Sequence, residues 1–234
     1  MTSQKHASLI FDLLKSHYPD AKMVLQWGNN FELLVAVILS AQCTDKKVNE
    51  VTASLFPKYQ QKRKGLEDRY ANYTRINVAK EQLIELVNFA NVPITELEQD
   101  IKPTGFYHNK AKSLQNAAKT VLEKFNGLLP KTIAELTTIP GVGRKTANVF
   151  LTNAYHIDEG IAVDTHVTKQ ARLLGLTKKN SPEKIEQDLM KLFPKSQWHQ
   201  LTYMLIEHGR NVRRKKSDRI LCNDKNCILC KSYR

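Results

Sequence analysis

The sequence predicts an all-α protein. Apolar side chains recur at helical spacing along most of the chain, and no segment shows the convincing apolar and polar alternation of a half-buried strand. Serine, threonine or aspartate precedes several of these segments and glycine follows others, as expected where helices begin and end. Hydrophobic residues make up 41% of the chain and charged residues 25%, so most of it should be packed.

The first helices are expected around 10–14 and over 31–40. The second is apolar nearly all round, which predicts a place in the middle of the fold. Thr44 or Asp45 can cap a third helix, which Pro57 should stop.

Residues 58–79 are polar, and we expect them to form an excursion on the surface. Helices should resume over 80–90. Thr95 and Glu98 have the spacing of a capping box, which predicts another helix start at Thr95. The clearest amphipathic helix is expected over 110–125, and Gly127 should close it.

A second capping box, Thr132 with Glu135, predicts a short helix that ends at Thr138. Residues 139–143 then form a tight turn, after which 144–154 restarts as a helix. The remaining helices are expected over 165–174, 182–193 and 197–208.

The charge of the chain favours a polyanionic partner. Lysine and arginine number 36 against 23 acidic residues, giving a formal net charge of +13, which indicates nucleic acid. The alternative is that a basic chain is merely soluble, or adheres weakly to anionic membranes. No export signal is evident, and the apolar run 33–39 is too short to span a bilayer. We therefore expect a cytoplasmic, nucleoid-associated protein whose thiols stay reduced.

The turn between the helices at 132–138 and 144–154 has the chemistry of a phosphate site. Gly141 and Gly143 are expected to bend through positive dihedral angles and to clear side chains from the approach of a ligand. The amides and positive dipole end of the second helix would face that ligand, and Arg144 and Lys145 add charge. An ordinary interhelical turn is the alternative for the glycines alone.

The wider sequence resembles the helix-hairpin-helix glycosylases of the endonuclease III family. The resemblance covers most of the chain from about Gln26 to Arg210. It implies an enzyme of base excision repair that removes oxidised pyrimidines and nicks double-stranded DNA 3′ to abasic sites. The segments that carry it are, in order, LSAQ and TD within 39–45, TGFYHNKA at 104–111, IPGVGRKTANV at 139–149, AVDTHV at 162–167 and EHGR at 207–210.

In that family the lysine after the hairpin is the nucleophile and the aspartate of the Val-Asp-Thr-His segment is its partner. The matching residues here are Lys145 and Asp164. An amine can displace a base at the sugar C1′ carbon and continue as a Schiff base, which a hydroxyl cannot do. The aspartate would face the developing sugar cation with its negative charge. The alternatives are that Lys145 only binds a phosphate and that Asp164 only caps a helix.

The resemblance also implies residues that open the duplex. Gln42 matches the glutamine that fills the gap left by the extruded nucleotide, and Phe106 stands where the family places a wedge. A core position is the alternative for Phe106. Asp45 and His166 are candidate groups of the lesion pocket, although a histidine here could equally be a helix-start residue. The DNA-contacting set expected around the hairpin is Gly141, Val142, Gly143, Arg144 and Thr146.

The fold that the resemblance implies has two helical lobes with the active site in the cleft between them. We expect a helical barrel over 23–157 that carries the hairpin at about 132–154, and a second lobe formed by 1–22 with 158–210. Residues 211–234 are expected to be a basic, cysteine-containing tail. We expect a monomer.

The cysteines depart from the family pattern. Members usually hold a four-iron, four-sulfur cluster on four C-terminal cysteines, the first of them soon after the His-Gly-Arg segment. Arg213 occupies that position, and the available residues are Cys222, Cys227 and Cys230. We therefore expect no cluster, with a site completed by an outside ligand or a histidine, holding a cluster or zinc, as the alternative. The lysine chemistry requires no cofactor.

Three other functions stay open on the sequence. Helix-hairpin-helix segments also occur in non-catalytic DNA-binding modules. A glycosylase without lyase activity, for mispaired adenine or alkylated purines, normally lacks the lysine. A lyase directed at pyrimidine photodimers can keep both the lysine and the aspartate.

Overall fold

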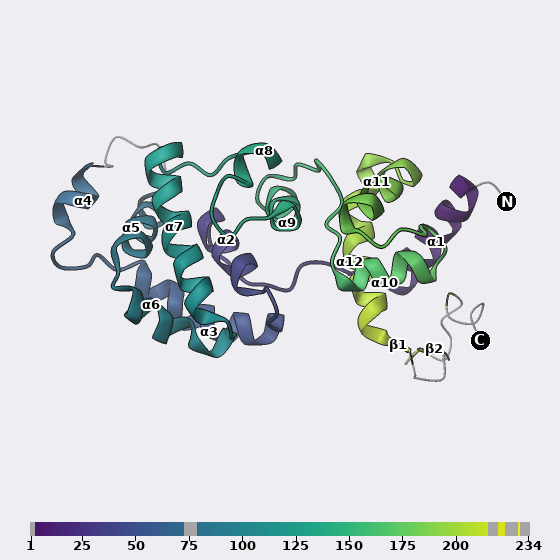
Figure 1. The fold of residues 1–234 in the computed structure, drawn as a ribbon, viewed down its shortest axis with the longest axis horizontal. Coiled ribbons are helices and arrows are strands. Elements are labelled where there is room, and N and C mark those ends of the chain that lie inside the picture. Colours follow the sequence, from purple (N-terminus) through teal and green to yellow (C-terminus); the bar gives the residue numbers. More distant parts are fainter. Residues whose placement is uncertain (1–2, 73–78, 215–219, 223–228, 230–234) are drawn as a thin grey trace. The chain divides into compact units, whose positions relative to one another are not determined.

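The computed structural model describes residues 3–72, 79–214, 220–222 and 229. In this part of the chain nearly all regular structure is helical, as the sequence predicts (Figure 1). The helices are α1 (Ser3–His17), α2 (Asn30–Leu39), α3 (Asp45–Tyr59), α4 (Glu67–Asn72), α5 (Lys80–Asn91), α6 (Ile94–Ile101), α7 (Tyr107–Phe125), α8 (Ile133–Leu136), α9 (Arg144–Tyr155), α10 (Thr165–Leu173), α11 (Pro182–Leu192) and α12 (Trp198–Asn211), with 3₁₀ turns η1 (Lys102–Thr104) and η2 (Lys195–Gln197).

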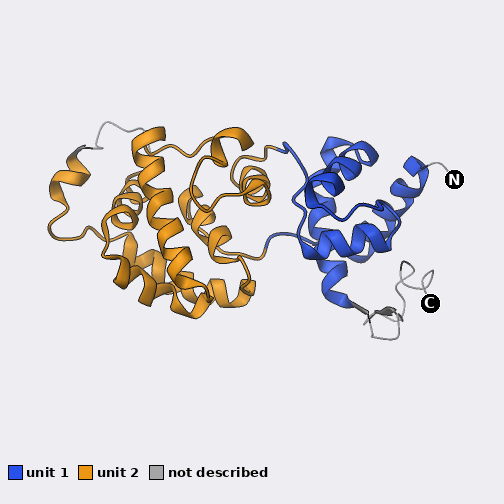
Figure 2. Ribbon diagram, viewed as in Figure 1, with its two compact units in different colours: residues 1–23, 158–234 blue, residues 24–157 orange. Residues whose placement is uncertain are grey.

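The chain divides into two compact units (Figure 2). Unit 2 is continuous and comprises Val24–Ile157. Unit 1 is formed by both ends of the chain, Met1–Met23 and Asp158–Arg234. The candidate hairpin therefore belongs to unit 2, and Asp164 belongs to unit 1.

Unit 2 is built around α2, as its apolar composition predicts. The Asn29 side chain caps the helix by accepting hydrogen bonds from the amides of Phe31 and Glu32. Every residue from Phe31 to Leu39 is buried, and α3, α5, α7 and α9 all contact this helix. A helix that is apolar nearly all round is stable only when others cover it, which accounts for this central position.

Two helix boundaries differ from the expected ones. Pro57 does not stop α3, because Gln60 N still bonds to Phe56 O at 3.0 Å and the helix reaches the buried Tyr59. Proline removes the amide that Ala53 O would have accepted, but this loss does not prevent the last turn of α3 from forming. The Thr95 capping box does not form, because α6 starts one residue earlier and the carbonyl of Pro93 accepts its first amide bonds.

The polar segment 58–79 is more ordered than a solvated excursion. Asn88 of α5 is fully buried, and its Nδ2 donates to the carbonyls of Tyr59 and Gln61 at 2.5 and 2.9 Å. Tyr70 of α4 donates to Asn88 Oδ1 at 2.6 Å and accepts from Arg63 N at 2.8 Å.

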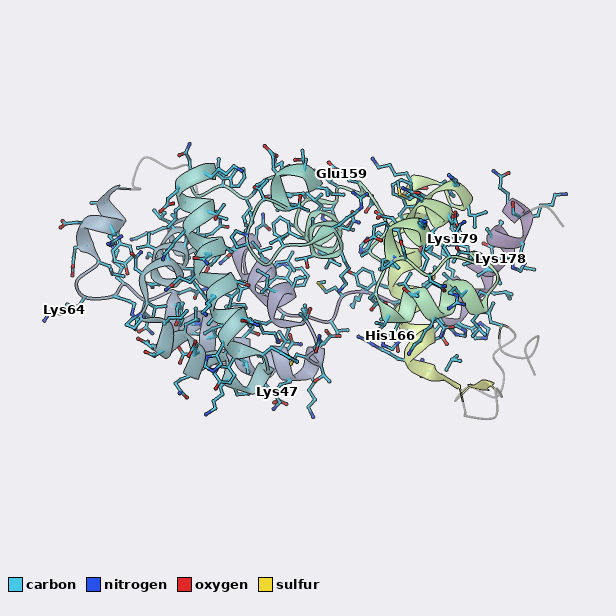
Figure 3. The ribbon with its side chains drawn as sticks, in the orientation of Figure 1. Lys47, Lys64, Glu159, His166, Lys178 and Lys179 are labelled. Carbon is cyan, nitrogen blue, oxygen red and sulfur yellow. The ribbon has the colours of Figure 1, made fainter. Side chains whose placement is uncertain are left out.

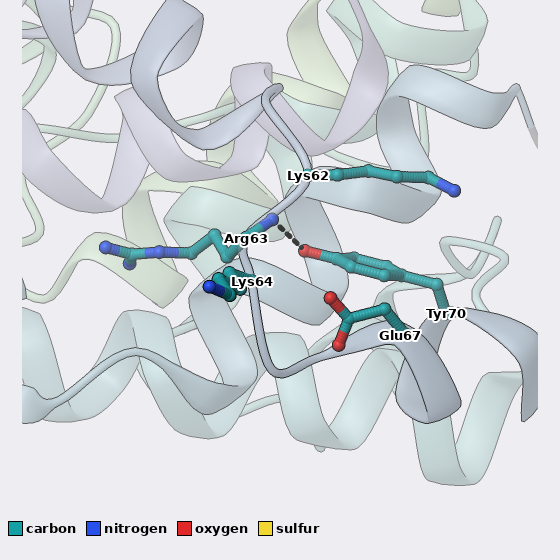
Figure 4. A pocket seen from close by; sticks show the side chains of 5 residues that line it. All are labelled: Lys62, Arg63, Lys64, Glu67 and Tyr70. Atoms are coloured by element: carbon teal, nitrogen blue, oxygen red, sulfur yellow. Dashed lines mark hydrogen bonds between the residues drawn. The ribbon is translucent and has the colours of Figure 1, made fainter.

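A cavity of about 320 Å³ lies in this segment, lined by Lys62, Arg63, Lys64, Glu67 and Tyr70 (Figure 4). Tyr59 and Tyr70 are buried, but most residues between them are exposed, so 59–70 lies at the surface as expected and is anchored there by its buried ends. Residues 73–78 lie outside the described residues.

Unit 1 has its own apolar core. Ala7, Ile10, Phe11 and Leu14 of α1 pack with buried residues of α10, α11 and α12. The α1 helix is longer than the expected 10–14 because its apolar stripe continues to Ala7 and has this core to cover.

The tail contains a short strand pair that helical periodicity could not indicate. Strand β1 (Val212–Arg214) pairs antiparallel with β2 (Ile220–Cys222), with Val212 opposite Cys222. Three residues are too few for an alternating pattern to be detected in a sequence. In the part of the chain that the structure describes, no helix is long and apolar enough to cross a membrane.

Candidate active-site and DNA-contact residues

The hairpin forms where the sequence predicts it. Thr132 caps α8 by accepting from Glu135 N at 3.2 Å, and its hydroxyl donates to Glu135 Oε2 at 2.8 Å. Gly141 then turns the chain with φ +83°. A Cβ atom at this glycine would lie 2.7 Å from Ser113 Cβ of α7. The hairpin therefore approaches α7 more closely than a residue with a side chain at position 141 would allow. Both the dihedral angle and the contact require glycine.

The second glycine has a different role from the one expected. Gly143 has φ −88° and ψ 174°, which any residue can adopt, and a Cβ atom there would meet open space. Only Gly141 bends through a positive dihedral angle. Gly143 is the N-cap of α9 and, as a glycine, makes no side-chain capping hydrogen bond. This helix end can receive a phosphate.

Val142 does not fit the role of a DNA contact. Its side chain is buried, and its amide bonds to Ile139 O at 3.0 Å within the turn. The residue therefore has neither an exposed side chain nor an available amide for DNA. We assign it to anchoring the hairpin in unit 2.

The charged residues expected beside the hairpin are accessible. Arg144 and Lys145 are the first two residues of α9, and both are exposed, while Thr146 is half-buried. Lys145 thus presents a primary amine in the first turn of the helix whose N-terminus could hold a phosphate. The candidate nucleophile and the candidate phosphate site therefore lie together at the start of α9.

Asp164 caps α10. Its Oδ1 accepts from Val167 N at 2.7 Å, and its side chain is half-buried. A charged carboxylate at a helix N-terminus is favoured by the dipole of that helix. One oxygen is used by the cap, and a carboxylate has a second with which to act. Asp164 therefore does cap a helix, and this capping bond does not prevent a role in the chemistry.

Gln42 and Phe106 share an unusual backbone conformation. Their φ angles are +53° and +50°, in the left-handed region that residues other than glycine rarely adopt. Both side chains are exposed, and Phe106 has 64% of its surface accessible. The core alternative for Phe106 is therefore wrong, because a large aromatic side chain projects from the surface of unit 2.

The two candidate pocket groups differ. Asp45 is the first residue of α3, and Thr44 is the cap, since its Oγ1 accepts from Lys47 N at 3.3 Å. His166 lies in the first turn of α10, labelled in Figure 3. A Cβ atom at Gly209 of α12 would stand 2.8 Å from His166 Nδ1. The histidine ring therefore packs against the glycine of the Glu-His-Gly-Arg segment, which explains why that position is small.

One residue that the sequence analysis left without a role is Lys110 of α7. Its side chain is only 5% exposed, and Nζ donates to Leu39 O at 2.9 Å and to Thr104 O at 2.8 Å. The signal that could have revealed it is its spacing. Lys110 precedes the buried Leu114 by one helical turn, so it occupies the apolar face of an amphipathic helix.

Comparison with known proteins assigns this arrangement to a family. The profile of the HhH-GPD superfamily of base excision DNA repair proteins matches residues 35–195. The endonuclease III of Synechocystis sp. is 42% identical over 91% of this chain and 86% of its own length, and that of Bacillus subtilis is 40% identical over 90% and 85%. The chain belongs to the endonuclease III family.

Solved structures of this family match the whole chain. A non-covalent endonuclease III–DNA complex superposes with a TM-score of 0.80 at 36% identity, covering 99% of this chain and 95% of that one. A trapped endonuclease III–DNA covalent intermediate superposes with a TM-score of 0.76 at 38% identity, covering 90% and 87%.

The four-cysteine pattern of the iron-sulfur cluster associated with the endonuclease III family is incomplete in this chain. Arg213, where the first cluster cysteine is expected, lies in β1 opposite Leu221. Cys222 belongs to β2, whereas Cys227 and Cys230 lie outside the described residues. Cys43 belongs to unit 2. A cluster held by cysteine alone needs four thiolates, and the position of the first is taken by a cation.

Proposed function

We propose that this protein is a bifunctional DNA N-glycosylase and AP lyase of base excision repair that acts on oxidised pyrimidines. The observation that carries the proposal is the exposed amine of Lys145 in the first turn of α9, directly after the glycine hairpin. The trapped covalent DNA complex of a similar protein supports it, because covalent capture requires a nucleophile.

The reaction follows from amine chemistry. The uncharged Lys145 Nζ attacks C1′ of the damaged nucleoside, the bond from C1′ to the base breaks, and the base leaves with a proton. The ring opens to give a Schiff base between Nζ and C1′. Loss of a C2′ proton then expels the 3′ phosphate by β-elimination, and water releases the lysine. The carboxylate of Asp164 lowers the energy of the cationic sugar in the first step and accepts or returns protons.

Access to the nucleoside requires extrusion from the stack. We infer that Gln42 fills the resulting gap and that Phe106 stacks beside the orphaned base, as its exposed aromatic ring allows. Gly141, Gly143, Arg144 and Thr146 would hold the phosphates of the strand. Asp45 and His166 stay candidates for the lesion pocket, with the packing of His166 on Gly209 favouring a structural role.

The partner we propose is double-stranded DNA with damaged or missing bases, bound by a monomer in the cytoplasm and nucleoid. The formal net charge of +13 suits a duplex. The basic tail 211–234 would add phosphate contacts and make binding strongly dependent on salt.

Borohydride trapping tests the nucleophile. Wild-type protein mixed with an abasic duplex should give a covalent adduct, because borohydride reduces the Schiff base to a stable amine. Lys145→Ala should give none. Lys64→Ala, which removes an exposed lysine of the 58–72 segment, is the matched control and should trap normally. Undiminished adduct from Lys145→Ala would rule out this nucleophile.

A panel of duplexes separates the remaining functions. Duplexes with thymine glycol or an abasic site should be cut. Duplexes with 8-oxoguanine or a pyrimidine dimer are the comparison substrates. Binding of abasic DNA without strand scission would favour a non-catalytic module. Faster scission at the dimer than at thymine glycol would favour the photodimer lyase.

A further inference from the structure

Lys110 connects the two segments that carry the candidate duplex-opening residues. It lies in the first turn of α7, in unit 2, and its ammonium group donates to two carbonyls. Leu39 O is the last carbonyl of α2, three residues before Gln42. Thr104 O ends η1, two residues before Phe106. One buried side chain therefore joins the end of α2, where the 40–44 loop begins, to the end of η1, where the 105–106 turn begins.

Both segments hold a strained residue. Among the described residues other than glycine, four have a positive φ angle. Asn126 and His156 are C-caps of α7 and α9, where the left-handed conformation is ordinary. Gln42 and Phe106 do not end a helix. Such a conformation costs free energy and persists only when the surrounding structure fixes it, as occurs at functional sites.

The lysine is suited to fix the two segments. Burial lowers the pKa of Lys110, and the two carbonyls offset the cost of burying the ammonium group by accepting its protons. Each accepted bond also fixes a carbonyl that a strained turn would otherwise leave free to rotate. The Lys110 amide bonds to Phe106 O at 3.1 Å, so this residue holds the 105–106 turn through both its backbone and its side chain.

The same helix also positions the hairpin. Ser113 is one turn after Lys110 on α7, and it is the residue against which Gly141 packs. The beginning of α7 thus contacts the 40–44 loop, the 105–106 turn and the phosphate-binding turn of unit 2. These are the segments of unit 2 to which the proposed function assigns contacts with DNA.

We propose that Lys110 is a positioning residue that ties the 40–44 loop to the 105–106 turn, so that Gln42 and Phe106 are held at a fixed separation before DNA binds. The inference rests on the proposed duplex-opening roles of these two side chains. Preorganisation means that no ordering of the two loops is required when the base is extruded, which speeds lesion processing without changing the chemistry at Lys145.

The test compares Lys110→Met, which keeps the length of the side chain but removes its donors, with Lys110→Arg and with Lys119→Met. Lys119 is an exposed lysine of the same helix and serves as the matched control. A duplex with 2-aminopurine opposite thymine glycol reports opening by fluorescence. Scission of an abasic single strand, which needs no opening, reports the chemistry.

Lys110→Met should lose about 10²-fold in kcat/KM on the duplex together with its fluorescence change, and keep scission of the single strand. Lys110→Arg should recover part of the opening, and Lys119→Met should behave as wild type. In a background of Gln42→Ala and Phe106→Ala, Lys110→Met should cost nothing further, because there is nothing left to position.

Other outcomes separate the roles of Gln42 and Phe106 from that of Lys110. If Gln42→Ala and Phe106→Ala leave opening unchanged, their proposed roles are wrong. If they reduce opening and Lys110→Met does not, the inference about Lys110 alone fails. Should Lys110→Met not fold, hydrogen exchange of the free wild-type protein carries the test. The bonded amides of the two segments are those of Cys43, Gly105 and Lys110. Protection of these amides supports preorganisation, and fast exchange there overturns it.

Discussion

Asp164 has two functions that one substitution can separate. Its carboxylate caps α10 and is also the proposed partner of Lys145. Asparagine caps a helix about as well as aspartate does, but it carries no charge. A capping role and an electrostatic role therefore predict different results for the same variant.

We expect Asp164→Asn to keep wild-type stability and to slow excision of thymine glycol by about 10²–10⁴-fold. Asp164→Ala should in addition lose about 0.5–2 kcal/mol of stability, because the bond to Val167 N is lost. Single-turnover excision rates and urea unfolding midpoints measure the two effects. Normal excision by Asp164→Asn would leave this residue with a capping role alone.

The two hairpin glycines give a second contrast between single residues. Gly141→Ala introduces a Cβ atom against Ser113 and forces a left-handed alanine, which costs about 1–2 kcal/mol for the backbone alone. Gly143→Ala has an ordinary φ angle and open space, so it should lose less stability than Gly141→Ala, by only the smaller amount by which alanine is a poorer N-cap than glycine. Urea midpoints of the two variants measure this difference. Equal loss in both would contradict the distinct roles assigned to the glycines.

At the residue scale, the sequence predicted types of chemistry better than it predicted environments. The exposed amine of Lys145 lies in the element expected for it. Burial of Val142 and the ordinary dihedral angles of Gly143 could not be predicted, because a Gly-Val-Gly sequence does not determine which residue faces the core or which glycine takes the positive φ angle. The burial of Lys110 could not be predicted, because a lysine in a helix is normally solvated and only the carbonyls of two other segments make its burial stable.

At the scale of elements, local signals located most helices. Ser181 and Pro182 start α11, and Thr132 starts α8, because caps satisfy the amides of their own helix and need no distant partner. Local signals fail where another group satisfies the same backbone atoms, or where a distant residue orders a segment. Pro93 accepts the amides that the Thr95 box would have served. The polar segment after α3 is ordered by Asn88, which is 18 residues from Tyr70 and gives no local signal.

The dependence of this segment on Asn88 can be measured. Asn88→Ala removes the side-chain donor to the carbonyls of Tyr59 and Gln61 and the acceptor of the Tyr70 hydroxyl proton, which should cost about 1–3 kcal/mol. Trypsin should then cleave rapidly among Lys62, Arg63 and Lys64.

Asn91→Ala is the control for this variant. Asn91 is on the same helix, but its side chain bonds only to Val87 O of that helix. Cleavage at 62–64 should be as slow as in the wild type. Equal cleavage of the Asn88 and Asn91 variants would show that the segment is held by something else.

At the scale of the whole molecule, the two units should respond to pH in opposite directions. In unit 2, burial and then a hydrogen bond with Glu32 raise the pKa of Glu85 to about 9. The folded state therefore holds a proton that the unfolded chain releases near pH 4.5. This stabilisation is complete below pH 4.5 and is lost as pH rises toward 9, by about 1.4 kcal/mol per pH unit.

In unit 1 the sign is reversed. Burial and then the charge of His17 lower the pKa of His208 to about 4, and Tyr18 Oη lies 3.1 Å from His208 Nδ1. The unfolded chain binds a proton near pH 6.5 that the folded unit excludes. The stabilisation is complete above pH 6.5 and is lost as pH falls through 4.

The two tryptophans allow each unit to be followed separately. Trp27 lines a cavity of about 300 Å³ together with Glu32 in unit 2, and Trp198 packs against the core of unit 1. Unfolding reported by Trp198 in the Trp27→Phe variant should move to lower urea as pH drops from 7 to 4.5. Unfolding reported by Trp27 in Trp198→Phe should move to lower urea from pH 6 to 8.5.

Substitution of Glu85 tests the cause of the alkaline response. Glu85→Gln should flatten the response that Trp27 reports, and the exposed Glu81→Gln should not. Identical pH profiles from both tryptophans would mean that the two units unfold as one.

The discontinuity of unit 1 has a consequence for how the protein is made. Residues 24–157 leave the ribosome as one uninterrupted stretch, so that domain can fold while translation continues. The apolar stripe of α1 is synthesised before unit 2, and its core is complete only after Leu201, Met204 and Leu205 have been made. Translation adds about 5–20 residues per second, so the apolar face of α1 stays exposed on the nascent chain for roughly ten seconds or more. Such a surface is a target for chaperones.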